Sequence, residues 1–276
     1  MGAEILSTLE PAILRCKLAA QCHAAAFLVL ISTQPAIAGP PFFTDDPVPV
    51  DQGHWEINNY ASATFAKEAF TGVAPGVDAN YGAAANLQLH LLAPMAYAQW
   101  SGVNTQYGVG DVEIGAKIRF LPAGENDWWP QIAFYPFLDF PTGNPDRGLG
   151  TGAMHAFFPL WLQKDFGSWS IYGGGGYWIN PGPGNRNYWS AGWVVQYQLT
   201  DSLALGGEIF HQTSSSTSGP GSPVYPLGTK DSTTLNFGGT YDFNRTYHLL
   251  FSFGRGLENA STTNLFSYYL ALRLTY

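Results

Sequence analysis

The sequence predicts an all-β protein, a closed antiparallel transmembrane β-barrel of about 12 strands. Three observations predict this fold. Hydrophobic and polar residues alternate with the two-residue period of a strand, aromatic residues gather at the ends of the apolar rows, and short connections alternate with long ones. The composition agrees, because charged residues make up only 12% of the 276 residues and aromatic residues 15%. Soluble domains carry about 25% charged residues.

The composition also excludes several classes of protein. Disordered chains are poor in aromatic residues and rich in charge. A formal net charge of −8 offers no basic stripe for nucleic acid, so nucleic-acid binding is excluded. A run of roughly 18 apolar residues, which a membrane-spanning helix needs, does not occur in the sequence.

Residues 1–38 have the pattern of a signal peptide. Arg15 and Lys17 precede a short apolar core at residues 24–31, and Ala-Ile-Ala at residues 36–38 gives the small-x-small pattern of a cleavage site. Both cysteines of the chain lie within this leader. The mature chain therefore has no disulfide, which a barrel closed by hydrogen bonds does not need.

Residues 39–53 form a proline-rich, acidic segment, for which the sequence predicts an irregular conformation on the periplasmic side. The stretch Thr44-Asp45-Asp46-Pro47 within it has two interpretations. Its carboxylates are able to act as a cation clamp, but Asp before Pro is a turn initiator, and the turn is favoured. The barrel itself is predicted over residues 54–276.

The strands follow one another from Trp55 to the end of the chain, and the last one is the clearest. Phe266, Leu270 and Leu272 fall on one face of it, and Ser267 and Arg273 on the other. A strand half in contact with lipid and half with a lumen shows this alternation. The complete pattern predicts strands at residues 54–66, 76–82, 86–99, 107–121, 130–140, 153–165, 169–179, 187–199, 203–213, 231–243, 246–255 and 263–276.

The ends of the strands add two further signals. Aromatic residues such as Trp189 and Tyr197 close the apolar rows, as expected of a girdle at the membrane interfaces. Tight turns alternate with long loops. The tight turns fall on one side of the barrel and the long loops on the other, except that the long connection 122–129 falls on the side of the tight turns. The tight turns are residues 167–168, 200–202 and 244–245, and the long loops are residues 141–152, 180–186, 214–230 and 256–262.

Five stretches carry a more specific signal: residues 43–47 (Phe-Thr-Asp-Asp-Pro), 53–56 (Gly-His-Trp-Glu), 86–91, 107–117 and 140–143. Together they resemble a family of bacterial outer-membrane proteins named for the meta-pathway of phenol degradation. The resemblance implies a secreted outer-membrane barrel, sometimes called a transporter, and it implies little about the substrate. Tyr276 is similar to the terminal aromatic residue that barrel-assembly machinery recognises in such proteins.

Inward-facing polar residues are the candidates for lining a solute path, because lumen residues tune selectivity whereas lipid-facing residues anchor the barrel. Their acidic excess predicts a lumen for cations or neutral solutes. The competing interpretation, favoured for any single residue, is that these charges pair across strands and fill the interior, with Asp111, Glu113, Lys117 and Arg119 forming a ladder. The predicted set is Glu56, Asn58, His90, Asp111, Glu113, Lys117, Arg119, Asp139, Glu208, Asp242 and Arg273.

The sequence predicts no metal, no cofactor and no catalytic residue. His90 lacks a second ligand at a suitable spacing, so a hydrogen-bonded lumen histidine is favoured over a metal ligand. A phospholipase is a remote alternative, since His211 shares a face with Thr213 beside Ser214. A hydroxyl nucleophile also needs an orienting group and an oxyanion element, and the sequence offers neither.

The predicted function is passive passage or uptake of small solutes, apolar or aromatic compounds among them, through an entrance between loops 141–152 and 214–230. Trp100, Trp178 and Tyr225 are predicted to offer stacking surfaces at the rim. The partners are then outer-membrane lipid and a small-molecule solute. Two alternatives stay open: a structural or adhesive outer-membrane barrel with a sealed lumen, and a soluble lectin.

Overall fold

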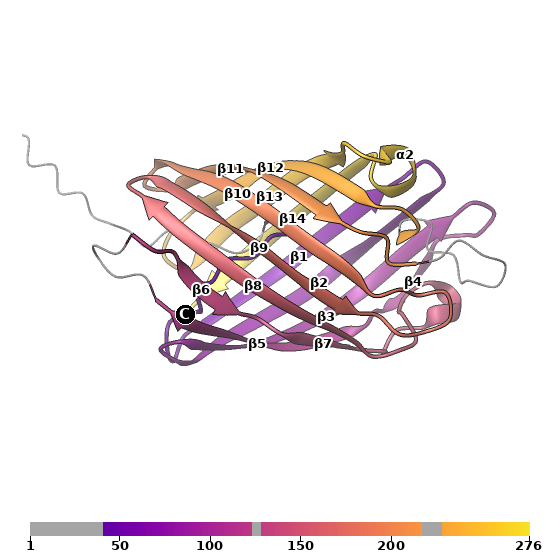
Figure 1. Cartoon of the computed structure of the whole chain (residues 1–276), viewed down its shortest axis with the longest axis horizontal. Helices are drawn as coiled ribbons and strands as arrows, with labels where there is room; N and C mark the ends of the chain where they lie inside the picture. Colours follow the sequence, from indigo (N-terminus) through magenta and orange to yellow (C-terminus); the bar gives the residue numbers. More distant parts are fainter. Residues whose placement is uncertain (1–40, 123–127, 217–227) are drawn as a thin grey trace, which may run out of the picture. The chain divides into compact units, whose positions relative to one another are not determined.

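The computed structural model describes residues 41–122, 128–216 and 228–276, so the predicted signal peptide lies outside the described residues. Within these ranges, fourteen strands form one sheet that closes on itself (Figure 1). The strands are β1 (Trp55–Phe65), β2 (Ala69–Ala84), β3 (Leu87–Trp100), β4 (Gln106–Val109), β5 (Val112–Leu121), β6 (Gln131–Phe134), β7 (Phe137–Phe140), β8 (His155–Phe166), β9 (Trp169–Ile179), β10 (Tyr188–Thr200), β11 (Leu203–Gln212), β12 (Ser232–Asp242), β13 (Tyr247–Gly256) and β14 (Phe266–Thr275).

The described strands make twelve crossings of the barrel wall, because β4 with β5 and β6 with β7 each form one interrupted crossing. β3 pairs with both β4 and β5, and β8 pairs with both β6 and β7. β1 and β14, the first and last strands, pair antiparallel from Glu56–Thr275 to Phe65–Phe266 and close the ring. A closed sheet leaves no unpaired edge in lipid. The predicted fold class is confirmed.

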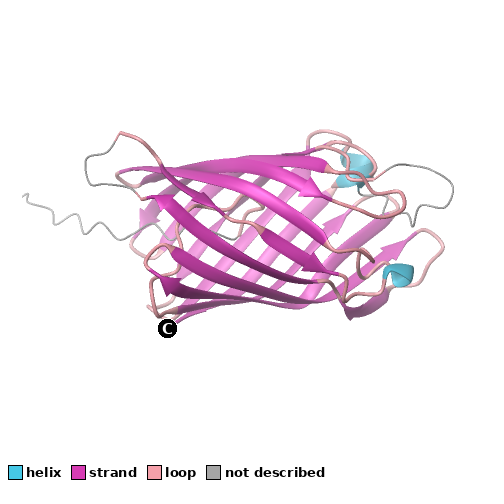
Figure 2. Ribbon diagram, turned by 60° about the horizontal axis from the view of Figure 1, so that its bottom comes forward, coloured by secondary structure: helices cyan, strands magenta, loops and turns pink. Residues whose placement is uncertain are grey.

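The connections sort to the two ends of the barrel as the sequence predicts. The turns at residues 167–168 and 201–202 lie at the end that holds the C-terminus, here called the turn end (Figure 1). The short helices η1 (Pro145–Arg147) and α2 (Ala260–Thr263) lie at the opposite end, here called the loop end (Figure 2). Among the described residues, no helix is long and apolar enough to cross a membrane. The long connections 122–129 and 214–230 fall partly outside the described residues.

Two strand boundaries differ from the prediction. β2 begins at Ala69 rather than at residue 76, and its pairing with β1 and β3 shifts around Pro75. Proline cannot donate to the ladder and is confined within sheets to edges and bulges, so it interrupts the sequence pattern although the strand continues. β14 begins at Phe266 rather than at residue 263, because α2 precedes it.

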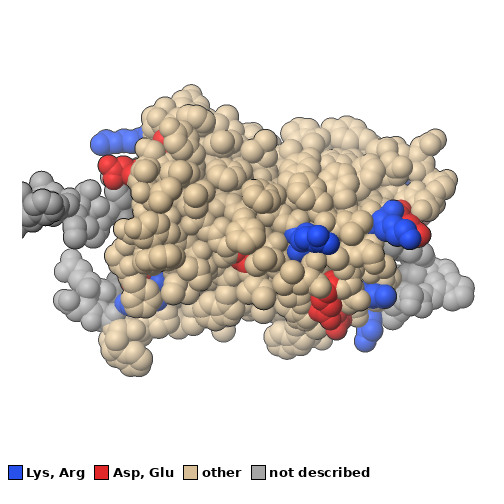
Figure 3. All heavy atoms as spheres, turned by 90° about the horizontal axis from the view of Figure 1, so that it is seen from above, with Lys and Arg blue, Asp and Glu red and all other residues tan. Residues whose placement is uncertain are grey.

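The two faces of the wall follow the predicted alternation. On β14, Phe266 and Leu270 are 47% and 50% exposed on the outer face, whereas Ser267 and Arg273 are 4% and 1% exposed on the inner face. The face seen in Figure 3 carries mostly uncharged side chains. Such a surface fits the hydrocarbon of a membrane better than water.

Aromatic pairs mark both ends of the outer face. Tyr177 and Trp189 lie with ring centroids 4.8 Å apart near the loop end, and Trp169 and Tyr197 lie 4.6 Å apart near the turn end. Amphipathic aromatic rings favour the level of the lipid headgroups. These pairs form the girdle that the sequence predicts.

Candidate functional site

The interior of the barrel holds the first described part of the chain. Residues 41–50 run through it without regular secondary structure, and Thr44 and Asp46 are fully buried there. We call residues 41–50 the lumen segment. Of residues 39–53, for which the sequence predicts an irregular periplasmic segment, residues 41–50 are irregular and lie among inward-facing side chains of the wall. A segment without periodicity gives no sign of the surface that it packs against.

Glu208 on β11 holds the lumen segment by its backbone. The backbone N–H of Thr44 donates to Glu208 Oε1 at 2.6 Å, and that of Phe43 donates to Oε2 at 3.3 Å. Asn236 on β12 donates its Nδ2 to Oε2 at 2.6 Å. Glu208 is 1% exposed, so these donors replace the water that its carboxylate lacks.

Lys117 on β5 binds the acidic part of the lumen segment. Its Nζ lies 3.0 Å from Asp45 Oδ1 and 3.8 Å from Asp46 Oδ1. It also donates to the backbone carbonyl of Val48 at 3.4 Å. Lys117 is 3% exposed, and a buried ammonium needs such partners to remain charged.

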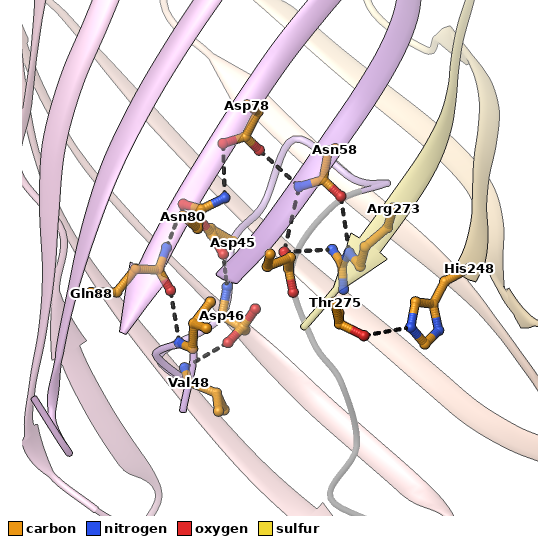
Figure 4. Close-up of polar contacts among 12 residues, drawn as sticks. Asp45, Asp46, Val48, Asn58, Asp78, Asn80, Gln88, His248, Arg273 and Thr275 are labelled. Carbon is orange, nitrogen blue, oxygen red and sulfur yellow. Dashed lines mark hydrogen bonds and ion pairs between the residues drawn. The ribbon is translucent and has the colours of Figure 1, made fainter. Parts of the chain in front are cut away.

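Both ends of the lumen segment bond to the wall as well. The backbone N–H of Val50 donates to Gln88 Oε1 on β3 at 2.9 Å, and Ser252 on β13 donates its hydroxyl to the carbonyl of Pro41 at 2.6 Å. Figure 4 shows the segment against the polar side chains of the wall. The lumen segment is therefore fixed to several strands by polar contacts.

The turn interpretation of residues 44–47 is correct. The backbone N–H of Asp46 donates to Asp45 Oδ1 at 2.7 Å, and that of Val48 donates to Asp46 Oδ1 at 2.6 Å. The cation that this turn meets is the ammonium of Lys117. Burial raises the pKa of Asp46 to about 7, against the opposing effect of Lys117 and with a further increase from Asp45.

Arg273 on β14 joins two of the predicted residues on β1. Its Nη2 lies 3.1 Å from Glu56 Oε1, and its Nε donates to Asn58 Oδ1 at 2.9 Å. Asn58 in turn donates Nδ2 to Asp78 Oδ2 on β2 at 3.0 Å (Figure 4). Together with His90 and its partners, these side chains make one polar wall of the lumen, formed by β14, β1, β2, β3 and β5.

His90 on β3 lies between two carboxylates. Its Nε2 is 2.7 Å from Glu113 Oε1 and its Nδ1 is 3.1 Å from Asp78 Oδ1. Asn80 Oδ1, 3.0 Å from His90 Nδ1, also accepts a bond from Gln88 at 2.6 Å. His90 is therefore a hydrogen-bonded lumen histidine. Among the described residues, no group of three His, Cys, Asp or Glu side chains is placed to hold a metal ion.

Two predicted residues lie at the ends of the barrel. The carboxylate of Asp111, between β4 and β5, accepts bonds from the backbone N–H of Gly143 at 2.9 Å and of Thr151 at 2.7 Å, and so fixes a long loop. Asp242 pairs with His248 Nδ1 at 2.6 Å near the turn end.

The remaining two lie on the wall near β5. Arg119 donates Nε to Asn86 Oδ1 at 3.1 Å and Nη2 to the carbonyl of Ala85 at 3.3 Å, which ties it to the turn after β2. Asp139 on β7 lies opposite Glu113 in the register of β5 and β7. All eleven predicted residues are thus placed. Asp111 and Asp242 lie at the ends of the barrel, and the other nine lie along its wall.

The predicted ladder of Asp111, Glu113, Lys117 and Arg119 is wrong. These four residues contact, in order, a loop, His90, the lumen segment and the turn after β2. Along this stretch the residues two positions apart carry like charges, and the opposite charges of Glu113 and Lys117 are four positions, about 13 Å, apart, too far for a direct ion pair. Their partners come from other elements.

Sequence analysis missed an aromatic part of the inner wall. Phe137 on β7, Phe157 on β8, Trp178 on β9 and Tyr188 on β10 lie side by side in the sheet register. Successive ring centroids are 5.3, 4.4 and 5.4 Å apart. We call these four residues the aromatic row. Trp178, predicted at the rim, belongs to it, whereas Tyr225 lies outside the described residues.

The signal was hidden because β8 carries apolar residues on both faces. Phe157 points inward and Phe158 points outward, where it is 43% exposed. Without alternation, the sequence does not show which of the two faces the lumen.

The described residues line two cavities beside the lumen segment. One of about 570 Å³ is lined by Tyr60, Asp78 and Ser252, among others. One of about 380 Å³ is lined on one side by Phe137, Phe157 and Trp178 of the aromatic row. Phe43 of the lumen segment lines both cavities, and its ring is 54% exposed. The lumen is occupied but not filled.

Solved structures with the same architecture include channels and porins. The COG4313 outer membrane channel from Pseudomonas putida F1 is 17% identical with a TM-score of 0.68, over 87% of this chain and 100% of that chain. The KdgM porin is 10% identical with a TM-score of 0.53, over 80% and 99% of the two chains. The NanC porin is 10% identical with a TM-score of 0.52, over 80% and 98%. At these identities the likeness shows a shared barrel fold.

No curated protein matches the sequence significantly. A family model described as "Putative MetA-pathway of phenol degradation" matches residues 60–274, which is nearly the whole barrel. The resemblance predicted from the sequence is thereby confirmed, and the chain belongs to this family.

Proposed function

We propose that this protein is an outer-membrane channel through which small solutes, apolar and aromatic compounds among them, diffuse passively. The observation that carries the proposal is a closed barrel with an apolar outside whose lumen keeps cavities of about 570 and 380 Å³. Protein interiors without such a role are close-packed, with few voids larger than a water molecule. The family description and the titles of the similar channels and porins support the same function.

The charges of the lumen favour neutral or cationic solutes. The lumen carboxylates of Asp45, Asp46, Glu56, Asp78, Glu113 and Glu208 outnumber the cations of Lys117 and Arg273, which pair with Asp45 and Glu56. A channel lined by an excess of negative charge repels anions. These residues are therefore proposed to line the solute path.

The lumen segment is the barrier in this conformation. It is held by Glu208, Lys117, Gln88 and Ser252 through hydrogen bonds and ion pairs. Water is able to replace polar contacts of this kind, so the segment is able to leave without breaking a strand of the barrel. Passage of a solute then requires its displacement.

This proposal is tested by conductance in planar bilayers. In the double variant Lys117→Met, Glu208→Gln, both main contacts of the lumen segment are weakened, and we expect severalfold more open-channel current than in the unmodified protein. Arg255→Gln is the control, because Arg255 is exposed on the other face of β13. No current from either protein, and no entry of solutes into liposomes, would contradict the proposal.

A structural or adhesive barrel with a sealed lumen is the second candidate, and the lumen segment itself favours it. Its Thr44 and Asp46 are as buried as core residues. The same conductance experiment decides between the candidates, because a sealed barrel stays closed even when the two contacts are removed.

We further propose that the protein is not an enzyme. His211, the histidine of the phospholipase alternative, lies 2.9 Å from Thr233 Oγ1, and Thr233 donates to Glu258 Oε2 at 2.8 Å. A hydrolase needs the histidine between the hydroxyl and the acid. Here the hydroxyl lies between the histidine and the acid, and its proton goes to the carboxylate.

A second histidine lies between an acid and a hydroxyl, as in a catalytic triad, but the hydroxyl proton points away from it. His248 lies between Asp242 and Thr275, at 2.6 Å and 3.1 Å. The hydroxyl of Thr275 donates to the carbonyl of Arg245 at 2.7 Å, so its proton is not directed at the histidine. His248 is also 3% exposed, out of reach of a substrate.

The partners proposed beyond a solute are outer-membrane lipid and barrel-assembly machinery. Lipid would cover the apolar outer face. The assembly machinery would recognise β14, which ends at Tyr276, a residue 60% exposed beside Trp55. Residues 1–38 are proposed to direct export before this step, with the mature chain beginning near residue 39.

A further inference from the structure

The aromatic row is a preorganised surface. Trp178 is stacked between Phe157 and Tyr188, with interplanar angles of 15° and 11°. Phe137 packs edge-on against Trp178 with centroids 5.3 Å apart. Because both faces of Trp178 are covered by its neighbours, the row offers chiefly ring edges to a flat ligand, without further loss of side-chain freedom.

The cavity beside the row has a defined composition. Phe137, Phe157 and Trp178 of the row line it together with Tyr135 and Trp161, and the last two are 5% and 3% exposed. Its volume of about 380 Å³ exceeds the roughly 150 Å³ that accommodates benzene in a protein interior. The space therefore suits one substituted aromatic ring.

The polar groups of the same cavity are mostly hydroxyls. They include Thr64, Thr71 and Thr234, and Ser190 lies directly beside the row. Ser190 Oγ accepts a bond from Trp178 Nε1 at 3.2 Å, so its own proton is available to an oxygen of a ligand. The described lining contains the carboxylate of Asp45 and no Lys or Arg. An anionic ligand in this cavity would therefore be repelled by the carboxylate of Asp45, and no cation of the lining would compensate its charge.

We propose that this cavity binds an uncharged single-ring aromatic compound that bears a hydroxyl group, with the ring against the aromatic row and the hydroxyl toward Ser190. This inference rests on the proposed channel function and names the solute class and its binding site. It concerns a site within the lumen, whereas the channel function concerns passage through it.

The lumen segment contributes to the same site. Phe43 and Asp45 both line the cavity, and the ring of Phe43 packs against Phe210 with centroids 5.2 Å apart. The site is thus complete only while the segment is docked. Release of the lumen segment should therefore increase the channel current and weaken the binding of the aromatic compound.

The test is equilibrium binding of radiolabelled phenol to the full barrel in nanodiscs, with binding to empty nanodiscs subtracted. Trp178→Leu removes the centre of the row, and we expect about tenfold weaker binding, the size expected for one lost aromatic contact and its apolar area. Trp193→Leu is the matched control, because Trp193 is 51% exposed on the outer face of β10. If Trp178→Leu does not fold, Phe43→Ala takes its place, since Phe43 lies outside the strands.

Two competitors sharpen the result. Cyclohexanol has the hydroxyl without the flat ring, and benzoate has the ring with a negative charge, so neither is expected to displace phenol. Equal displacement by cyclohexanol, stronger displacement by benzoate, or unchanged phenol binding in both Trp178→Leu and Phe43→Ala would overturn the proposal.

The double variant Lys117→Met, Glu208→Gln separates this proposal from the channel proposal. Weaker phenol binding with a larger current supports both. A larger current with unchanged phenol binding overturns the aromatic site alone, and phenol binding without current in any variant overturns the channel alone.

Discussion

At the scale of single residues, the deepest charges of the barrel each have a specific set of partners. Arg273 and Glu208 are both 1% exposed. A charge removed from water costs several kcal/mol unless it is paired or hydrogen-bonded. Arg273 contacts Glu56 and Asn58 across the closing seam of the sheet, and Glu208 receives backbone N–H groups of the lumen segment. These charges therefore fix the wall and the segment in place.

Replacing Arg273 by Met leaves the carboxylate of Glu56 without its main partner beside β14. We expect the free energy of unfolding to fall by about 3 kcal/mol, because loss of one member of a buried ion pair leaves an uncompensated charge. Urea unfolding followed by tryptophan fluorescence measures this change. Arg255→Met, on the exposed face of β13, is the control, and an equal loss in both variants would contradict a specific role for the pair.

Inward orientation was predictable residue by residue, but partners were not. Asn58 and Arg273 alternate with apolar neighbours, which fixes the face that they occupy. The bond between Thr44 and Glu208 joins residues 164 positions apart, and no local pattern contains that information. Asp78 was missed because the alternation of its strand is broken near Pro75.

At the scale of elements, proline explains why the lumen segment stays apart from the sheet. Pro41, Pro47 and Pro49 lack an N–H and cannot take part in a ladder. The segment satisfies its remaining backbone groups with side chains of the wall instead, as the bonds of Thr44 to Glu208 show. An element of this kind is bound to the barrel without being part of it.

Docking of the lumen segment is expected to depend on pH through Asp46. Its pKa is raised from 3.8 to about 7, chiefly by burial. Lys117 opposes this increase, and Asp45 and Glu56 add to it. The docked state thus binds the proton more tightly than the released state, so docking is strongest at low pH and weakens as the pH rises from 3.8 to about 7, above which this group adds no further change. We expect severalfold more channel current at pH 8 than at pH 5.

The variant Asp46→Asn is the control for this pH dependence, because its side chain is uncharged throughout and retains an oxygen for the N–H of Val48. Current measured at both pH values should then be equal. An increase in current on acidification of the unmodified protein, or a full pH dependence in Asp46→Asn, would show that another group controls docking.

The strands were predictable where one face is polar and not where both are apolar. β14 was located within three residues of its observed start, and β2 was shortened at Pro75. β8 was located, but the inward direction of Phe157 was not, because Phe158 is equally apolar. Alternation of apolar and polar residues distinguishes the lipid-facing side of a strand from a polar lumen side. It cannot show the inward direction where the lumen side is aromatic.

At the scale of the whole molecule, the lumen has two chemically different sides. The polar wall, from β14 to β5, holds Asn58, Asp78 and His90, whereas the aromatic row spans β7 to β10. The lumen segment lies between cavities that adjoin both, with Phe43 lining each. The lumen therefore offers an aromatic surface as well as a polar one, whereas a wholly polar lumen would offer no surface for an apolar ring.

Closure of the barrel predicts a further property of the whole molecule. β1 and β14 pair over ten residues of each strand, so the sheet has no free edge at which a detergent can begin to separate the strands. We expect the unheated protein in dodecyl sulfate to migrate differently from the boiled protein. Leu270→Pro should abolish this difference, because Leu270 pairs with Ala61 on one side and Phe251 on the other, and proline removes a ladder N–H. Leu270→Val keeps that N–H and the apolar contact with lipid, so it should retain the two mobilities. Equal mobility of the unmodified protein before and after boiling would show that the ring does not close as a stable unit, and the channel proposal would then lose its structural basis.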